Sequence, residues 1–223
     1  MQRETIMNVI KFLLEKLSDL RVDGDERLPD SGGYIVATNH ISRLDTPFLM
    51  LSTARKDVIG MIAKEYQRIP FFRWVLSSME VIWVSREEYD FAAFRSAVDY
   101  LKHGWVVGMA PEGTRSKDGT LITGKPGVAL LAKKAGVQIV PAAITGSADM
   151  AKRLSHFKKM NVHVRFGKAF SLPVSKEGEG RDYLVQATDE IMCQIGALLP
   201  EARRGVYANH PRLKVLLAHQ NET

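Results

Sequence analysis

Cysteine is nearly absent from this sequence: its 223 residues include one, Cys193. A single thiol excludes an intrachain disulfide and a cysteine metal cluster, and it agrees with a reducing compartment. No apolar run approaches the roughly 20 residues that a membrane-spanning helix requires. Internal repeats and low-complexity tracts are lacking too. The sequence therefore predicts one domain that is soluble or attached to a membrane surface.

Positive charge is in excess. The chain carries 31 Lys and Arg against 25 Asp and Glu, a net charge of +6. Such an excess attracts nucleic acid or an anionic bilayer. A nucleic-acid-binding surface would interleave aromatic with basic residues or carry a recognisable motif, and neither pattern occurs here. An anionic membrane surface is therefore the expected polyanionic partner, and nucleic acid is not expected.

Short apolar runs alternate with helical patterns along most of the chain. The expected strands are residues 34–38, 58–63, 81–84, 105–110, 138–144 and 162–166. The expected helices are residues 45–55, 71–78, 87–103, 126–135 and about 182–199. Continuously apolar strands separated by helices are typical of a mostly parallel sheet covered on both faces. The predicted fold class is α/β, a single domain with a mostly parallel or mixed central sheet and helices on both faces.

The two ends of the chain differ from this alternation. Residues 4–20 place Ile6, Ile10, Leu13 and Leu17 at spacings of three and four, which predicts an amphipathic helix. Such a stripe serves equally for packing on the core or for lying in a membrane interface. The expected division is an N-terminal amphipathic helix at 1–22, the main domain at 23–200 and a basic tail at 201–223.

One histidine and one aspartate stand where chemistry gathers in sheets of this class. A buried strand leads into Asn39 and His40, and a helix is expected to begin near Asp45. If the loop curls back, the carboxylate accepts a hydrogen bond from one ring nitrogen and leaves the other nitrogen to take a proton. The alternatives are that Asp45 caps its own helix and that His40 is an ordinary loop histidine.

A second group of residues suits a phosphate. Gly113 lets backbone amides approach an anion, Thr114 adds a hydroxyl, and Arg115 offers a planar fork that matches phosphate oxygens. The adjacent Glu112 is expected to hold Arg115 or another cation in place. Further cations follow other strands or precede a helix, namely Lys64, Arg86 and Lys125. If the strands are parallel neighbours, these cations share one sheet edge with His40, which favours a reaction on the hydroxyl of a phosphorylated small molecule.

These residues resemble the blocks of a known family, the PlsC-like glycerolipid acyltransferases typified by lysophosphatidic acid acyltransferase. The match covers roughly residues 33–147, and four blocks occur in the family's order. The blocks are Asn39-His40-x4-Asp45, then Lys64, Pro70 and Arg86, then residues 111–116 (Pro-Glu-Gly-Thr-Arg-Ser), and residues 140–147 (Val-Pro-Ala-Ala-Ile-Thr-Gly-Ser). Four blocks in order are a specific resemblance, whereas each block alone is weak.

The resemblance implies a function and roles. It implies His40 as the base, Asp45 as its orienting partner, and Arg115 with Lys64 and Arg86 as ligands of the acceptor phosphate. The donor in such enzymes is an acyl thioester of coenzyme A or acyl carrier protein, and the family needs no metal or other cofactor. The expected acceptor is a lysophospholipid, lysophosphatidic acid giving phosphatidic acid. The expected location is peripheral, on the cytoplasmic side of a membrane.

Other functions remain open at this point. The acceptor can instead be another lysophospholipid or a glycolipid, and the chain can be a catalytically silent lipid-binding relative. A phosphate-directed hydrolase is disfavoured, because no convincing set of metal carboxylates or nucleophile is present. No Gly-x-Ser-x-Gly elbow occurs, and Cys193 lies outside the four blocks. Direct acyl transfer without an acyl-enzyme intermediate is therefore expected.

Overall fold

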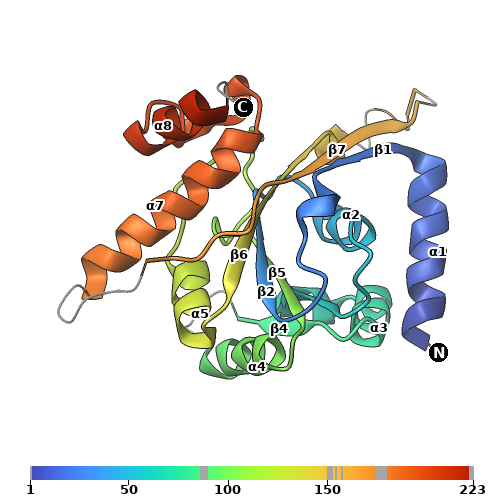
Figure 1. Ribbon diagram of the computed structural model, residues 1–223. Coiled ribbons are helices and arrows are strands. Elements are labelled where there is room, and N and C mark those ends of the chain that lie inside the picture. Colours follow the sequence, from blue (N-terminus) through green and yellow to red (C-terminus); the bar gives the residue numbers. More distant parts are fainter. Residues whose placement is uncertain are drawn as a thin grey trace.

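The computed structural model describes residues 2–85, 90–149, 153, 155–156, 158–173 and 180–220. These residues form a seven-stranded sheet in the order β1-β7-β6-β2-β5-β3-β4 (Figure 1). The strands are β1 (Ser18–Asp23), β2 (Tyr34–Thr38), β3 (Val58–Ala63), β4 (Ile82–Val84), β5 (Val106–Met109), β6 (Gln138–Thr145) and β7 (Met160–Phe166). The described helices of seven or more residues are α1 (Gln2–Leu17), α2 (Asp45–Leu51), α3 (Pro70–Ser78), α4 (Phe91–Lys102), α5 (Gly127–Ala135), α7 (Gly180–Leu198) and α8 (Pro211–Gln220).

The sheet is mixed. Strands β2 to β6 run parallel to one another, β7 pairs antiparallel with β6, and β1 pairs parallel with β7. The carboxyl ends of β2, β3, β4, β5 and β6 therefore lie at one edge of the sheet. The predicted α/β class and mixed central sheet are confirmed.

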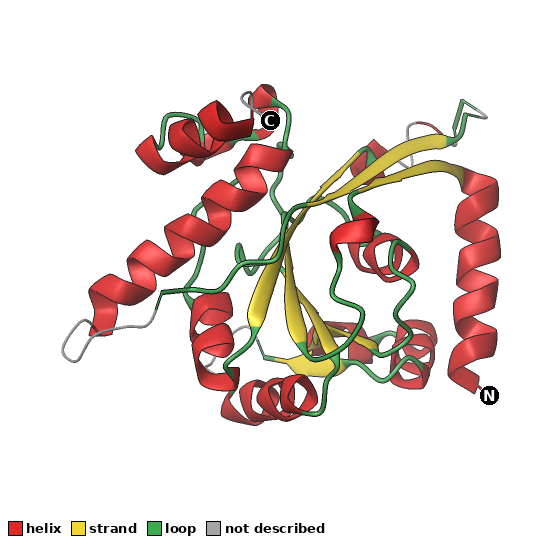
Figure 2. Cartoon of the chain, viewed as in Figure 1, coloured by secondary structure: helices red, strands yellow, loops and turns green. Residues whose placement is uncertain are grey.

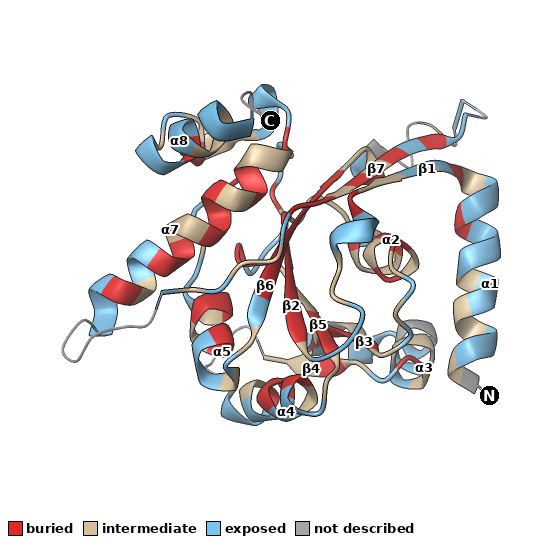
Figure 3. Cartoon of the chain, viewed as in Figure 1, coloured by how far each residue is buried: buried red, intermediate tan, exposed pale blue. Residues whose placement is uncertain are grey.

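Helices cover both faces of the sheet (Figure 2). Alternate residues of β2 enter different cores: Ile35 packs with buried residues of α4, α5 and α7, whereas Val36 packs with those of α1 and α2. Figure 3 shows buried residues along α7 and along the central strand β2, whereas β1 and β7 also carry exposed positions. Burial on both faces explains why the strands read as continuous apolar runs.

The first strand was not expected from the sequence. The predicted helix 4–20 ends at Leu17, and Ser18–Asp23 form β1 instead. The Ser18 hydroxyl donates to the Leu14 carbonyl, which closes the last helical turn. Strand β1 then pairs with β7 along its whole length, from Ser18 opposite Met160 to Asp23 opposite Arg165. Pairing with a segment so distant in the chain overrides the helical spacing of Leu17 and Leu20.

Helix α1 packs against α2, α3 and β1, and it also exposes apolar side chains. Leu14 is buried in the core that it shares with α2. Val9, Phe12 and Leu13 remain about half exposed, at 53%, 57% and 49%. Within the described ranges, every helix is too short or too polar to cross a bilayer. Core packing is thus observed for one side of α1, while its other side presents apolar surface to solvent.

The residues expected to form a basic tail fold against the rest of the protein. Helix α8 packs on α7, and Leu213 of α8 is fully buried in the core that includes residues of α7. Before α8, the backbone of Leu121 bonds to that of Arg203 and Val206, and the hydroxyl of Tyr207 accepts from the Gly124 amide. The C-terminal segment therefore holds the loop that follows the third sequence block.

Candidate active site

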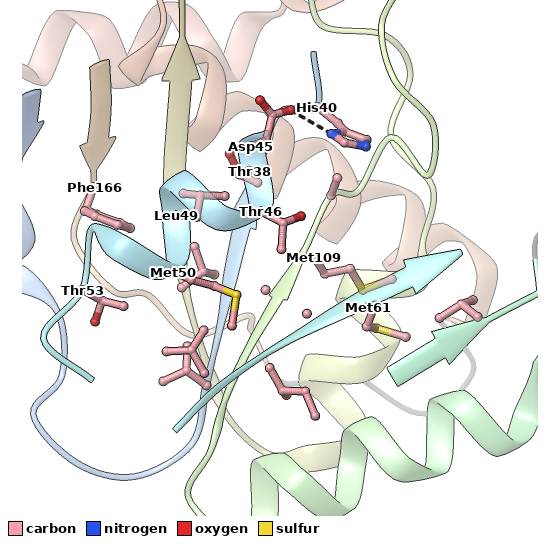
Figure 4. A pocket seen from close by; sticks show the side chains of 18 of the residues that line it. Thr38, His40, Asp45, Thr46, Leu49, Met50, Thr53, Met61, Met109 and Phe166 are labelled. Atoms are coloured by element: carbon pink, nitrogen blue, oxygen red, sulfur yellow. Dashed lines mark hydrogen bonds and ion pairs between the residues drawn. The ribbon is translucent and has the colours of Figure 1, made fainter. Parts of the chain in front are cut away.

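His40 and Asp45 meet at the carboxyl edge of the sheet. Strand β2 ends at Thr38, the chain turns through His40, and Asp45 opens α2. His40 Nδ1 lies 2.8 Å from Asp45 Oδ2, and Figure 4 shows the pair side by side. The Asp45 side chain is 2% exposed and that of His40 21%. The bond occupies Nδ1, so Nε2 is the ring nitrogen that can take a proton from a substrate.

The Asp45 carboxylate is fixed by donors from two directions. Oδ2 also accepts the backbone amides of Ile41 and Ser42, each at 2.8 Å. Oδ1 accepts the hydroxyl of Ser147 at 2.6 Å, from the loop that follows β6. All these donors lie outside α2, so the carboxylate organises the histidine loop, and the alternative that it caps its own helix is wrong. Together with the His40 ring, these donors hold the carboxylate in one position.

Glu112 has a different position from the one expected. The prediction that Glu112 holds Arg115 or another cation is wrong. Both of its carboxylate oxygens accept backbone amides instead. Oε1 takes the amide of His40 at 2.8 Å, and Oε2 takes that of Ile122 at 3.2 Å. Glu112 is 1% exposed, and burial raises the pKa of its carboxyl while the two amide bonds oppose that rise. Its carboxylate therefore anchors the backbone of the proposed base.

Replacing Glu112 with glutamine is expected to destabilise the protein. A glutamine presents one oxygen and one NH2 group, so one of the two buried amides loses its acceptor and faces a donor. An unsatisfied buried group costs about 1 to 3 kcal/mol. Denaturant unfolding of Glu112→Gln should show this loss. The control is Glu15→Gln. The Glu15 side chain is exposed on α1, so this change should alter the free energy of unfolding by at most about 0.5 kcal/mol. Equal stability of the two variants would contradict the anchoring role.

Two predicted phosphate ligands, Arg115 and Lys125, lie on or against the turn that follows β5. The carbonyl of His40 accepts the amide of Ser116 at 2.8 Å, which brings the adjacent Arg115 to the histidine loop. Gly113 has a positive φ of 66°, and a Cβ there would lie 3.3 Å from Lys125 Nζ. The Lys125 ammonium thus lies against the turn at Gly113. Thr114 is exposed on the same turn.

Lys64 and Arg86 have different outcomes. Lys64 follows β3, and its ammonium bonds to Asp90 Oδ2 at 2.7 Å, at the start of α4. The Lys64 bond, together with the amides of Ala93 and Ser85, holds the pKa of the Asp90 carboxyl well below its usual range. A substrate phosphate at Lys64 would compete with this carboxylate. Arg86 lies outside the described residues.

An apolar cavity of about 170 Å³ opens beside the pair. It runs under α2, and Met50, Met61 and Met109 lie below the histidine in the view of Figure 4. Two glycines create the space, because Gly60 of β3 and Gly108 of β5 are register partners on the face below α2. A Cβ at Gly108 would find one neighbour within 4 Å, the Ile59 carbonyl oxygen at 3.9 Å. The cavity suits a flexible hydrocarbon chain.

Sequence reasoning gave no role to two residues that organise this edge. The side-chain amide of Asn39 pairs with both backbone groups of Ile144, at 2.9 and 2.8 Å, and joins the end of β2 to β6. Ser147 bonds to Asp45 as described above. Both belong to the quoted sequence blocks, yet their partners lie more than one hundred residues away, at separations of 105 and 102. The signal that could have pointed to Asn39 and Ser147 is their place in those sequence blocks.

Known proteins share sequence similarity with much of this chain. A model of the family described as Acyltransferase matches residues 19–145. A 1-acyl-sn-glycerol-3-phosphate acyltransferase of Borreliella burgdorferi is 32% identical over 125 residues, which are 55% of this chain and 50% of that one. A protein of the same name from Bacillus subtilis is 26% identical, over 72% of this chain and 78% of that one.

A solved structure is also similar. The crystal structure of the 1-acyl-sn-glycerophosphate (LPA) acyltransferase PlsC from Thermotoga maritima superposes with a TM-score of 0.62 at 26% identity. The match covers 83% of this chain and 76% of that one. This chain spans half the length of the Borreliella relative. Because the family model covers more than half of the chain and the PlsC fold is shared, the chain belongs to the PlsC-like acyltransferase family.

Proposed function

We propose that this protein transfers a fatty acyl group from a thioester to the free hydroxyl of a 1-acyl-sn-glycerol 3-phosphate, giving phosphatidic acid. The observation that carries the proposal is the His40–Asp45 pair, bonded at 2.8 Å at the mouth of an apolar cavity. A base beside a hydrocarbon-sized space fits an acyl transfer better than a hydrolysis of phosphate. The names of the relatives support the same reaction.

His40 acts as a general base in this proposal. Its Nε2 takes the proton of the acceptor hydroxyl as that oxygen attacks the thioester carbonyl. The tetrahedral intermediate collapses with cleavage of the carbon–sulfur bond, and the imidazolium returns the proton to the departing thiolate. Asp45, with Glu112 nearby, supplies negative charge that stabilises the imidazolium. Atoms and charge balance without a covalent enzyme intermediate.

Direct transfer is further supported by the state of the cysteine. Cys193 is fully buried on α7, among side chains of the α4–α5–α7 core. Burial raises the pKa of its thiol to about 12. A thiol kept protonated and shielded from substrate is a poor nucleophile. The hydroxyl of the acceptor is therefore the attacking group.

The cavity and the exposed apolar surface support lipid substrates at a membrane surface. The cavity under α2 receives one acyl chain, and the phosphate lies at the sheet edge near Arg115 and Lys125. The acceptor leaves and returns to a bilayer, for which the exposed side of α1, with Val9, Phe12 and Leu13, provides an interfacial contact. The net charge of +6 favours an anionic surface. We place the protein peripherally, on the cytoplasmic side.

A substrate panel tests this function. The purified chain is incubated with labelled acyl groups on coenzyme A or on acyl carrier protein. The acceptors are lysophosphatidic acid, lysophospholipids with larger headgroups and a glycolipid. The expected product is labelled phosphatidic acid, formed faster than any other lipid. Faster transfer to another lysolipid would replace lysophosphatidic acid as the proposed acceptor. Binding of lysolipids without transfer to any of them would overturn the catalytic proposal in favour of a silent lipid-binding protein.

A further inference from the structure

A second hollow lies near the histidine loop and shares no lining residue with the apolar cavity. It has a volume of about 250 Å³ and is lined by Ile41, Ile144, and residues of the turn 116–119. Each of three lining residues is bonded to the catalytic pair or its support: Ile41 to Asp45, Ser116 to His40, and Ile144 to Asn39. The hollow is therefore built into the same edge of the sheet as the proposed base.

Two cations line this hollow, and neither is among the phosphate ligands expected from the sequence. Lys117 follows Ser116 on the turn, and Arg203 comes from the C-terminal segment, outside the family match at 19–145. Arg203 Nη1 donates to the main-chain carbonyl of Asp118 at 2.9 Å. A Cβ at Gly119 would lie 2.5 Å from that nitrogen, so glycine there lets the guanidinium lie against the turn. The Arg203 carbonyl also accepts the Leu121 amide, so the backbone and the side chain of Arg203 both bond to this loop.

One carboxylate, that of Asp118, also lines the hollow, and it accepts hydrogen bonds from residues of its own turn. Asp118 Oδ1 accepts the amide and hydroxyl of Thr120 and the hydroxyl of Ser116, at 2.9 to 3.0 Å. These bonds, led by the Thr120 amide, lower the pKa of the carboxyl to about 2. Arg203 bonds to the carbonyl of Asp118 and not to this carboxylate. Two cations against one such anion leave the hollow with net positive charge.

We propose that this hollow is a phosphate-ester subsite, in which Arg203 and Lys117 bind a phosphate of one of the two substrates. Among the hydrogen bonds of the described residues, one nitrogen of the Arg203 guanidinium is used, by the Asp118 carbonyl. The planar fork therefore keeps N–H groups for phosphate oxygens. The inference rests on the proposed acyl transfer for the identity of those substrates.

The acceptor carries one phosphate, which is proposed above to lie near Arg115 and Lys125, so the donor is the expected source of a phosphate in this hollow. In a 1-acyl-sn-glycerol 3-phosphate, the phosphate is attached to the carbon next to the one that bears the reacting hydroxyl. Ile41 and Ser116 line the hollow and bond to the catalytic loop, whereas His40 itself lines the apolar cavity. The phosphates of coenzyme A lie far from its sulfur, at the end of the pantetheine arm, and they would reach the hollow if the arm folds back.

Arg203→Gln and Lys117→Gln test the subsite against Arg204→Gln. Arg204 is the neighbouring residue, bonds to the Leu199 carbonyl and does not line the hollow, so it controls for the loss of one charge. Loss of a charge-assisted bond to phosphate should raise the KM of one substrate about tenfold or more, with a smaller change in kcat. KM is measured separately for lysophosphatidic acid and for acyl-coenzyme A. Arg203→Lys should recover part of the loss.

The substrate whose KM rises identifies the phosphate. A rise for lysophosphatidic acid assigns the hollow to the acceptor, and a rise for acyl-coenzyme A assigns it to the donor. Unchanged KM values for both, or the same rise in Arg204→Gln, would overturn the subsite. Equilibrium binding of glycerol 3-phosphate and of coenzyme A tests the subsite independently of the proposed acyl transfer. Binding that depends on Arg203 in a protein without transfer activity would reject the proposed function and leave the subsite intact.

Discussion

Replacing His40 with alanine is expected to lower kcat by about two to four powers of ten, the usual contribution of a positioned general base. The protein should stay folded, because the ring is partly exposed and the Asp45 carboxylate keeps its bonds to Ile41, Ser42 and Ser147. The measurement is kcat for acyl transfer to lysophosphatidic acid, beside the midpoint of thermal unfolding. Removing the base should leave binding of the acceptor, and hence its dissociation constant, nearly unchanged.

A matched control exists elsewhere in the sheet. His163 Nε2 bonds to Asp23 Oδ2 at 2.7 Å, and its side chain is 20% exposed, against 21% for His40. This second His–Asp pair joins β7 to β1 and lines neither the cavity nor the hollow. His163→Ala should retain wild-type kcat. If His40→Ala also retained it, or if both variants lost activity equally, His40 would not be the base.

The sequence was sufficient for most of the fold because the signals are local. The strands at 34–38 and 58–63 were predicted with the bounds that the structure has, since burial on both faces makes each an uninterrupted apolar run. Strand β1 was not predicted, because its pairing with β7 depends on residues about 140 positions away. The C-terminal helix α8 was not predicted as a packed element either, and its burial depends on Leu213 meeting α7.

The same difference between local and distant contacts explains the site. His40 and Asp45 are five positions apart, and a single turn brings them together. The bond from the His40 amide to Glu112 spans 72 positions, and the bond from Ser147 to Asp45 spans 102. The charges next to Glu112 in the sequence suggested that it binds a cation, whereas in the fold its carboxylate accepts two backbone amides. Arg203 reaches the sheet edge through a segment with no pattern of its own in the sequence.

Asp45→Asn is the second substitution with a large expected effect. Asparagine is nearly the same size, and its oxygen can replace Oδ2 as the acceptor for Ile41, Ser42 and the His40 ring. Its NH2 group would then face the Ser147 hydroxyl, which can rotate to accept. The loop can therefore keep its shape while the negative charge beside the imidazole is lost. Loss of that charge should lower kcat by about two to four powers of ten.

Ser147→Ala separates charge from scaffolding. It keeps the Asp45 charge and removes one of the four hydrogen bonds that the carboxylate accepts. Loss of one such bond to a charged group costs about 1.5 to 3 kcal/mol, and this cost should appear mainly in the free energy of unfolding. The expected order of kcat is wild type, then Ser147→Ala, then Asp45→Asn far below. If the two variants lost kcat equally, Asp45 would act by holding the loop, and stabilisation of the imidazolium by its charge would be excluded.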